Sequence, residues 1–235
     1  MSTVFPAKPK EGSEPIPPLE NGDHLTREEF ERRYEAMPHL KKAELIKGVV
    51  HMPSPLRYRC HGQQSSHLIW WLMEYAVWTR GVDAGDNCTV KVDFENEPQP
   101  DALLMILPEY GGQCRIDQDG FIIGSPELTG EVAASSVSYD LHEKLDVYRQ
   151  NGVREYIVWR VLDKAIDWFV LVGDKYETLP LSPEGWYRSQ VFPGLWLDPQ
   201  ALLTGDLARV AEVVRHGLAD AAHQRFVEEL AKRRQ

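Results

Sequence analysis

Cysteine is scarce in this chain. The 235 residues include only Cys60, Cys88 and Cys114, which stand far apart and form no CxxC pair. An odd, scattered set argues against a disulfide framework, and the missing pair argues against a zinc site built from thiolates. We therefore expect a protein of a reducing compartment, long enough to depend on a hydrophobic core rather than on covalent staples.

Long hydrophobic runs are also missing. No stretch approaches the roughly 20 apolar residues that a membrane-spanning helix requires. Residues 1–24 are rich in proline and charge and contain no apolar run typical of a signal peptide. The sequence thus predicts a cytoplasmic protein without membrane contact. We interpret residues 1–24 as a flexible N-terminal arm.

The signatures of common nucleotide-binding and hydrolytic sites are absent as well. The sequence contains no GxGxxG, GxxxxGK[ST], HExxH or GxSxG motif. Ser135 and Ser136 stand near a glutamate, but no spacing of the eight histidines predicts a catalytic triad. Cys60 is adjacent to His61 in sequence only, which gives little support for a thiol nucleophile.

Positive charge is in short supply, with a formal net charge of −10. It is also uneven: residues 41–80 hold six bases against two acids, whereas residues 83–119 hold nine acids against two bases. A protein that binds DNA without specificity is usually basic. An acidic cluster beside a basic strip suits a metal site next to a polyanion, and it equally suits two ordinary solvated faces.

What the chain does contain is a regular alternation of helices and strands. Thr26 and Glu29 form a capping box that begins the first helix, and apolar periodicity defines the rest. The predicted elements are a helix from Thr26 to Pro38, a hairpin over 43–52 turning at Lys47-Gly48, a helix over 61–80, strands over 90–94, 102–107 and 127–134, a helix over 141–152 capped by Asp140 and stopped by Gly152, a strand meander over 154–181 and a helix over 206–234. This order predicts an α/β fold, a mixed sheet flanked by helices.

Three side chains stand out as candidates for chemistry. Asp101 opens the apolar strand over 102–107, where a charge is costly unless it is paired or bound to a metal; a loop-capping role explains it equally well. Glu131 lies among small residues at a strand end, and an exposed strand glutamate is the simpler interpretation. Lys144 lies at the edge of the apolar face of its helix, where a snorkelling surface lysine is the commoner case.

Three further residues are weaker candidates. Glu44 precedes a strand and is also consistent with a surface glutamate. His61 begins the helix over 61–80 within a basic stretch. We assign Tyr148 to packing, with its hydroxyl near the site.

In combination these segments resemble the Uma2 family of restriction-endonuclease-like proteins, which is similar to the PD-(D/E)xK nuclease superfamily. The resemblance covers roughly residues 25–203, and its most specific part is KxxxYxxxGVxEY, from Lys144 to Tyr156. The other segments that carry it are ELIKGVVHMPSP (44–55), His61, QPDALL (99–104), GEVAASS (130–136), DLHEKLDVYRQNGVREYIVW (140–159) and FPGLWLD (192–198).

The resemblance implies a fold, an activity and a set of residues. The fold is restriction-endonuclease-like, and the activity is Mg²⁺- or Mn²⁺-dependent hydrolysis of phosphodiester bonds in DNA. Asp101 and Glu131 would bind the metal, with the backbone carbonyl of Val132 as a further ligand. Glu44 would be the carboxylate of the first motif, and Lys144 the lysine of the site. His61 and Tyr148 would be accessory.

The superfamily usually places its lysine two residues after the second carboxylate, where this chain has Ala133; the resemblance implies that in this family Lys144 has taken over this role. Two departures from the family bear on activity. The family usually has Glu-Val-Leu-Ser-Pro-Ser where this chain has EVAASS over residues 131–136. The strand after GVREY usually ends in an acid, where this chain has Arg160. These departures and the net charge motivate two alternatives: a non-catalytic binding or assembly protein on a nuclease scaffold, or a hydrolase of smaller phosphate esters.

The resemblance also suggests how the chain is divided. We expect a restriction-endonuclease-like domain over residues 25–203 and a C-terminal helical extension over residues 204–235. The meander is rich in aromatic residues and looks exposed, so we predict self-association, as a homodimer; the alternative is that its tryptophans fill the core. The aromatic residues in question are Trp159, Trp168, Phe169, Tyr176, Trp186 and Trp196.

Overall fold

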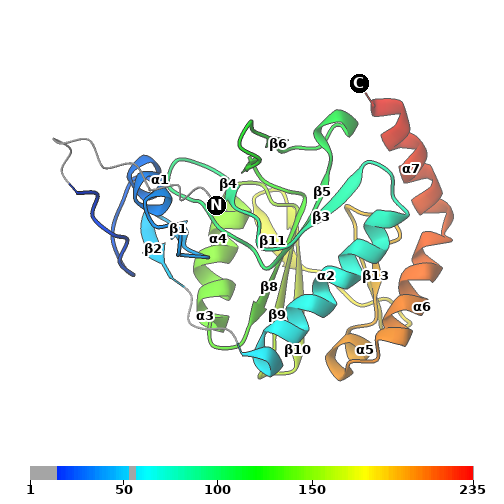
Figure 1. The fold of residues 1–235 in the computed structure, drawn as a ribbon. Helices are drawn as coiled ribbons and strands as arrows, with labels where there is room; N and C mark the ends of the chain where they lie inside the picture. The colour runs from blue at the N-terminus through cyan, green and yellow to red at the C-terminus, as the bar shows by residue number, and fades with distance from the viewer. Residues whose placement is uncertain (1–14, 53–56, 235) are drawn as a thin grey trace, which may run out of the picture.

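The computed structural model describes residues 15–52 and 57–234. Its centre is a six-stranded sheet in the order β11-β10-β9-β8-β5-β3 (Figure 1). In this sheet β8 and β9 run parallel, and every other neighbouring pair is antiparallel. The strands are β3 (Val82–Gly85), β5 (Ala102–Ile106), β8 (Leu128–Ala133), β9 (Glu155–Arg160), β10 (Ala165–Val172) and β11 (Lys175–Thr178). A mixed sheet with flanking helices confirms the predicted fold class.

Helices lie on both faces of this sheet, and the alternation of side chains along β9 explains why. Ile157 and Trp159 point into the main core, whereas Tyr156 and Val158 belong to a separate cluster on the opposite face. Because both faces are apolar, both must be covered. The main core lies under α2 (Gly62–Val77), α5 (Pro199–Thr204), α6 (Leu207–Leu218) and α7 (Ala221–Arg233), and the other face under α3 (Val137–Tyr139) and α4 (Leu145–Gln150) (Figure 1).

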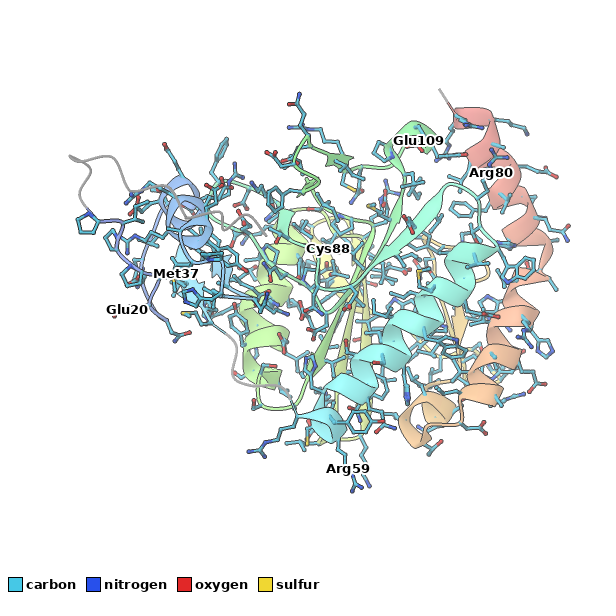
Figure 2. All side chains as sticks on the ribbon, viewed as in Figure 1. Glu20, Met37, Arg59, Arg80, Cys88 and Glu109 are labelled. Atoms are coloured by element: carbon cyan, nitrogen blue, oxygen red, sulfur yellow. The ribbon has the colours of Figure 1, made fainter. Side chains whose placement is uncertain are left out.

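The helix α2 spans one side of the molecule. Figure 2 shows Arg59, just before the helix, and Arg80, just after it, at opposite ends. The apolar stripe predicted for this helix is buried, with Leu68, Trp71 and Tyr75 each at most 1% exposed. Its N-terminal end, which begins after His61, therefore has a fixed position relative to the sheet.

A smaller cluster packs α1 (Arg27–Glu35) against a hairpin of β1 (Glu44–Ile46) and β2 (Val49–His51). The hydroxyl of Thr26 accepts a hydrogen bond from the Glu29 N–H at 3.3 Å, so the predicted cap is confirmed. The hairpin turns at Lys47 and Gly48, both with positive φ. This hairpin is important for the site because it carries Glu44.

Short strands complete the fold. A three-stranded sheet, β4-β7-β6, packs against β5 through Leu103 and Met105. Single turns of 3₁₀ helix occupy Tyr58–Cys60 and Pro108–Tyr110. The remaining strands are β4 (Val90–Lys91), β6 (Arg115–Ile116), β7 (Ile122–Ile123), β12 (Tyr187–Arg188) and β13 (Trp196–Leu197).

The region 206–234, predicted as one helix, forms two. The helix α6 ends at Leu218, and Asp220 caps α7 by accepting a hydrogen bond from the Ala222 N–H at 2.7 Å. The apolar stripe continues through the break, since Val210 and Leu230 are both buried. Periodicity alone therefore did not reveal it.

The helix predicted to begin at Asp140 begins earlier. The helix α3 starts at Val137 and continues through a π-helical turn, Asp140–Lys144, into α4. Asp140 is buried inside this turn, and its carboxylate accepts a hydrogen bond from the Ser136 hydroxyl at 2.6 Å. The assignment of Asp140 as the helix cap is therefore wrong.

The aromatic residues of the meander are not the exposed patch that was predicted. Trp159 and Trp168 are buried in the main core, and the rings of Trp168 and Trp71 meet in a T-shaped pair with 5.6 Å between their centroids. Phe169, Tyr176, Trp186 and Trp196 are half-buried. They fill space between strands and helices, so they do not support self-association.

Residues 1–14 of the predicted arm lie outside the described residues. Of the rest, Leu19 is buried beside Phe30, and the Gly22 N–H donates to the Val50 carbonyl at 2.8 Å. The domain boundaries remain predictions. Within the described ranges, no helix has the length and apolar character needed to traverse a bilayer.

Candidate functional site

Asp101 immediately precedes β5 and stands opposite Glu131 of the neighbouring strand β8. The register of β5 and β8 pairs Ala102 with Gly130, which places Asp101 across from Glu131. Gly130 faces α2, where Leu68 lies against it. Because side chains alternate along a strand, Glu131 points to the opposite face, toward α4. The N–H of Val132 donates to Asp101 Oδ2 at 2.9 Å, which ties the aspartate to β8.

Glu131, Lys144 and Glu44 form a buried triad. Lys144 Nζ lies 2.7 Å from Glu131 Oε1 and 2.8 Å from Glu44 Oε1. Tyr148 adds a hydrogen bond from its hydroxyl to Glu131 Oε1 at 2.9 Å. Lys144 is 2% exposed and Glu131 3%. The alternative of a snorkelling surface lysine is therefore wrong, because the ammonium group is directed into the protein.

The π-helical turn places this lysine. A π turn inserts an extra residue into the helix and rotates the residues after it, and such turns are frequent at functional sites. Here the turn ends at Lys144, and α4 then continues to Tyr148, one helical turn further along. Both side chains consequently reach the same oxygen of Glu131.

Glu44 reaches the triad from the hairpin. Its Oε1 also accepts a hydrogen bond from the Gln99 N–H at 2.7 Å. The backbone of Leu45 exchanges hydrogen bonds with Glu97, so the segment leading to Asp101 runs beside β1. One carboxylate thus holds the lysine and anchors the strand that carries Asp101.

Asp101 is surrounded by hydrogen-bond donors. His61 Nε2 donates to Oδ2 at 3.0 Å, and Lys42 Nζ donates to Oδ1 at 3.1 Å. The Lys42 ammonium also contacts Asn87 Oδ1 at 2.9 Å. His61 comes from the N-terminal end of α2, whereas Lys42 precedes β1. Three separate parts of the chain therefore meet at one aspartate.

Lys42 is a site residue that sequence reasoning missed. In the sequence it is one base of the basic strip over 41–80. The available signal was its spacing, since Lys42 lies two residues before Glu44 and residues at that spacing share one side of an extended chain. In the structure the Lys42 ammonium contacts the Asp101 carboxylate, and the Glu44 carboxylate contacts the Lys144 ammonium.

The pKa values reflect this crowding of charge. Burial works to raise the pKa of Asp101, but the hydrogen bond from His61 and the charge of Lys42 outweigh it and hold that pKa well below its usual range. Burial works to raise the pKa of Glu131, and the nearby charge of Asp101 adds to the rise, whereas the charge of Lys144 opposes it. Burial alone would lower the pKa of Lys144, but Glu131 and Glu44 hold it well above its usual value.

The donor set fits a hard divalent cation in kind, because such ions prefer carboxylate oxygens. Asp101 and Glu131 supply two carboxylates, with the backbone of Val132 beside them. Within residues 15–52 and 57–234, however, no three His, Cys, Asp or Glu side chains converge as a ready cation site. Lys42 and Lys144 each hold one of the two carboxylates. A cation must therefore compete with two ammonium groups.

The predicted residues thus fall into two linked groups. Glu44, Glu131, Lys144 and Tyr148 form one group. Asp101 and His61 form the other, and Val132 connects the two because it follows Glu131 and donates to Asp101. The Val132 contact is made by its N–H, whereas the resemblance assigned a role to its carbonyl.

The sequence and the fold both match known proteins. The model of the Uma2 family, described as "Putative restriction endonuclease", matches residues 27–200. The crystal structure of a "putative nuclease belonging to DUF820" from Anabaena variabilis is similar, with a TM-score of 0.52 and 14% identity, covering 73% of this chain and 97% of that chain. At this identity the likeness concerns the fold. No curated protein matches the sequence.

Proposed function

Because this chain belongs to the Uma2 family, described as "Putative restriction endonuclease", we propose that it hydrolyses phosphodiester bonds in DNA with Mg²⁺ or Mn²⁺. The single observation that carries the proposal is the buried contact of Lys144 with Glu131, next to a second carboxylate, Asp101, which immediately precedes the adjoining strand. Two carboxylates and a lysine are a sufficient set for metal-assisted phosphodiester hydrolysis.

Each residue has a distinct part in this proposal. Asp101 and Glu131 would hold the cation, together with the carbonyl of Val132. When bound, the cation supplies polarisation of a phosphoryl oxygen and lowers the pKa of a bound water. Lys144 orients the attacking water and stabilises the negative charge that develops on phosphate. The burial of Asp101, Glu131 and Lys144 supports these roles, because charges act more strongly away from water.

The remaining residues position these groups. Glu44 also holds the Lys144 ammonium, and Tyr148 fixes the Glu131 carboxylate. His61 orients Asp101, whereas Lys42 pairs with this carboxylate and would compete with the cation for it. Hydrogen bonds of this kind to metal-binding groups usually affect metal affinity and activity.

The test is nicking of supercoiled plasmid DNA with Mg²⁺ or Mn²⁺. We expect nicking by the wild type and at least a hundredfold slower nicking by Asp101→Ala and Glu131→Ala. Glu177→Ala, at an exposed position on β11, is the matched control and keeps wild-type activity. Equal rates for the wild type and the two site variants would discard the assignment.

A binding or assembly protein on a nuclease scaffold is the second candidate. The observation that favours it is the pairing of both carboxylates with ammonium groups, together with the net charge of −10. Calorimetry with Mn²⁺ separates the two candidates. No binding at millimolar Mn²⁺ supports the scaffold, whereas binding that Asp101→Ala abolishes supports the enzyme.

We also propose that the protein is a homodimer. The support comes from α2 rather than from the meander. Val77 and Trp78 are 68% and 64% exposed, and they line an open groove of about 1000 Å³ with Leu218 and Val227. A large apolar side chain beside an apolar groove is a common feature of interfaces.

A further inference from the structure

We propose that His51 and Tyr139 are substrate-contacting residues of the same site, donating hydrogen bonds to the non-bridging oxygens of the phosphodiester. The inference rests on the proposed nuclease function. Neither residue was singled out in the sequence, and neither takes part in the contacts among Glu44, Asp101, Glu131 and Lys144 described above.

Both residues lie beside the Lys144 triad. In the hairpin, His51 of β2 pairs directly with Glu44 of β1, and residues paired in this way present their side chains on the same face. Tyr139 ends α3, immediately before the π-helical turn that carries Lys144. Lys144 Nζ lies 5.8 Å from the centroid of the Tyr139 ring, and the rings of His51 and Tyr139 lie 4.5 Å apart.

Their polar atoms are buried and unpaired. Neither His51 Nε2 nor the Tyr139 hydroxyl has a hydrogen-bond partner among the described residues. Buried polar groups in native proteins are nearly always hydrogen-bonded, so each exception requires an explanation. Two such atoms on adjoining rings, beside a buried lysine, indicate a place prepared for an acceptor.

Other tyrosines of the chain show that this is unusual. The hydroxyl of Tyr148 donates to Glu131, that of Tyr156 to the Asp140 carbonyl, and that of Tyr176 to the Val153 carbonyl. In each case the fold supplies the acceptor. Tyr139 has no such acceptor in the described residues, which separates it from tyrosines with a purely structural role.

The chemistry suits a phosphodiester. Its two non-bridging oxygens carry the negative charge and accept hydrogen bonds, whereas Glu44 nearby would repel them. A phenol hydroxyl and an imidazole with its proton on Nε2 are neutral hydrogen-bond donors. They can bind the anion, whereas another lysine at this position would form an ion pair with Glu44 instead. Lys144 supplies the cationic charge on the same side.

The experiment compares Tyr139→Phe with Tyr176→Phe, which makes the same chemical change where the hydroxyl has a structural acceptor. We expect Tyr139→Phe to keep the wild-type melting temperature and to lower kcat/KM for plasmid nicking about tenfold, as loss of one hydrogen bond to a charged group predicts. Tyr176→Phe should lower the melting temperature and leave the nicking rate of the folded protein unchanged.

His51 is tested in the same way. We expect His51→Leu to weaken binding of a fluorescent DNA duplex, measured with Ca²⁺ in place of Mg²⁺, about tenfold. His51→Gln, which keeps a donor, should restore part of that affinity. Mn²⁺ affinity should be unchanged in all variants, because neither residue is a proposed metal ligand.

Two results would overturn this inference alone, and a third would also overturn the proposed nuclease function. Wild-type nicking by both Tyr139→Phe and His51→Leu, or a melting temperature lowered by Tyr139→Phe with an unchanged nicking rate, refutes the role of these residues alone. If the wild type itself neither binds nor nicks DNA, the proposed function fails and this inference fails with it.

Discussion

Lys144 and Glu131 form an ion pair inside the protein, with 2.7 Å between Nζ and Oε1 and at most 3% of either residue exposed. The lysine comes from a helix and the glutamate from the sheet beneath it. Burying two charges costs several kcal/mol each unless their geometry and further hydrogen bonds compensate. Glu44 and Tyr148 supply that compensation. Such an arrangement adds little net stability to a fold, because desolvation of the charges offsets their attraction. It does hold the charged groups in a fixed geometry, which a catalytic site needs.

The first prediction concerns the stability that depends on this pair. Lys144→Met should lower the free energy of unfolding by about 3 kcal/mol, because it leaves two buried carboxylates without a counter-charge. Urea unfolding followed by circular dichroism measures the change. Lys175→Met, at an exposed lysine of β11, is the control and should change the value by less than about 0.5 kcal/mol. Equal midpoints for both variants would contradict the account of the triad.

The second prediction concerns Lys42, which competes with a cation for Asp101. Lys42→Met should bind Mn²⁺ about tenfold more tightly than the wild type, because removing a nearby positive charge favours the ion by on the order of 1.4 kcal/mol. Calorimetry measures the affinity, with Lys41→Met at the exposed neighbouring position as the control. Weaker Mn²⁺ binding by Lys42→Met would show that the lysine supports the metal site instead.

The third prediction concerns pH. Burial raises the pKa of Glu97 to about 8, and a hydrogen bond with Glu31 and its charge add to the rise. The folded state therefore holds a proton that the unfolded state releases near pH 4.5, so this group stabilises the fold at low pH and the contribution is lost as pH rises toward about 8. Glu97→Gln, which cannot ionise, should lose less stability than the wild type between pH 5 and pH 8.

Melting temperatures at several pH values test this directly. Glu177→Gln, at an exposed position, is the control and should follow the wild-type curve. A Glu97→Gln variant with the same pH dependence as the wild type would show that Glu97 is ionised in the folded protein throughout the range.

The fourth prediction concerns self-association. Trp78→Ser should shift the protein from dimer to monomer in light scattering, since Trp78 is the large exposed side chain of the groove that Val77, Leu218 and Val227 also line. Its effect on the melting temperature of the monomer should be small because the side chain lies mostly in solvent. A wild type that is monomeric at all accessible concentrations would reject the dimer.

Much of the fold could be predicted from local pattern. The Thr26 cap, the Lys47-Gly48 turn and the apolar strand after Asp101 each leave a signature within a few residues, and the structure confirms them. The break between α6 and α7 lay beneath an uninterrupted apolar stripe, although Asp220 is a standard N-cap residue and was the available signal.

The site was harder to predict, because it depends on long-range geometry. A glutamate among small residues and a lysine at the edge of a helix face do not reveal that Glu131 and Lys144 meet, since the π-helical turn that brings them together leaves no periodic signal. Asp140 was predicted to cap the helix because the π-helical turn that it begins leaves no periodic signal in the sequence. The contact of Lys42 with Asp101 spans 59 positions, and no local rule connects them.

The most direct test of the central claim is a crystal of the protein soaked in Mn²⁺, with the ion located by anomalous scattering. The account predicts one Mn²⁺ ion within about 2.3 Å of a carboxylate oxygen of both Asp101 and Glu131. The Lys42 ammonium should have moved off Asp101. A crystal at millimolar Mn²⁺ with no ion at these two residues, and with Lys42 and Lys144 still on their carboxylates, would contradict it.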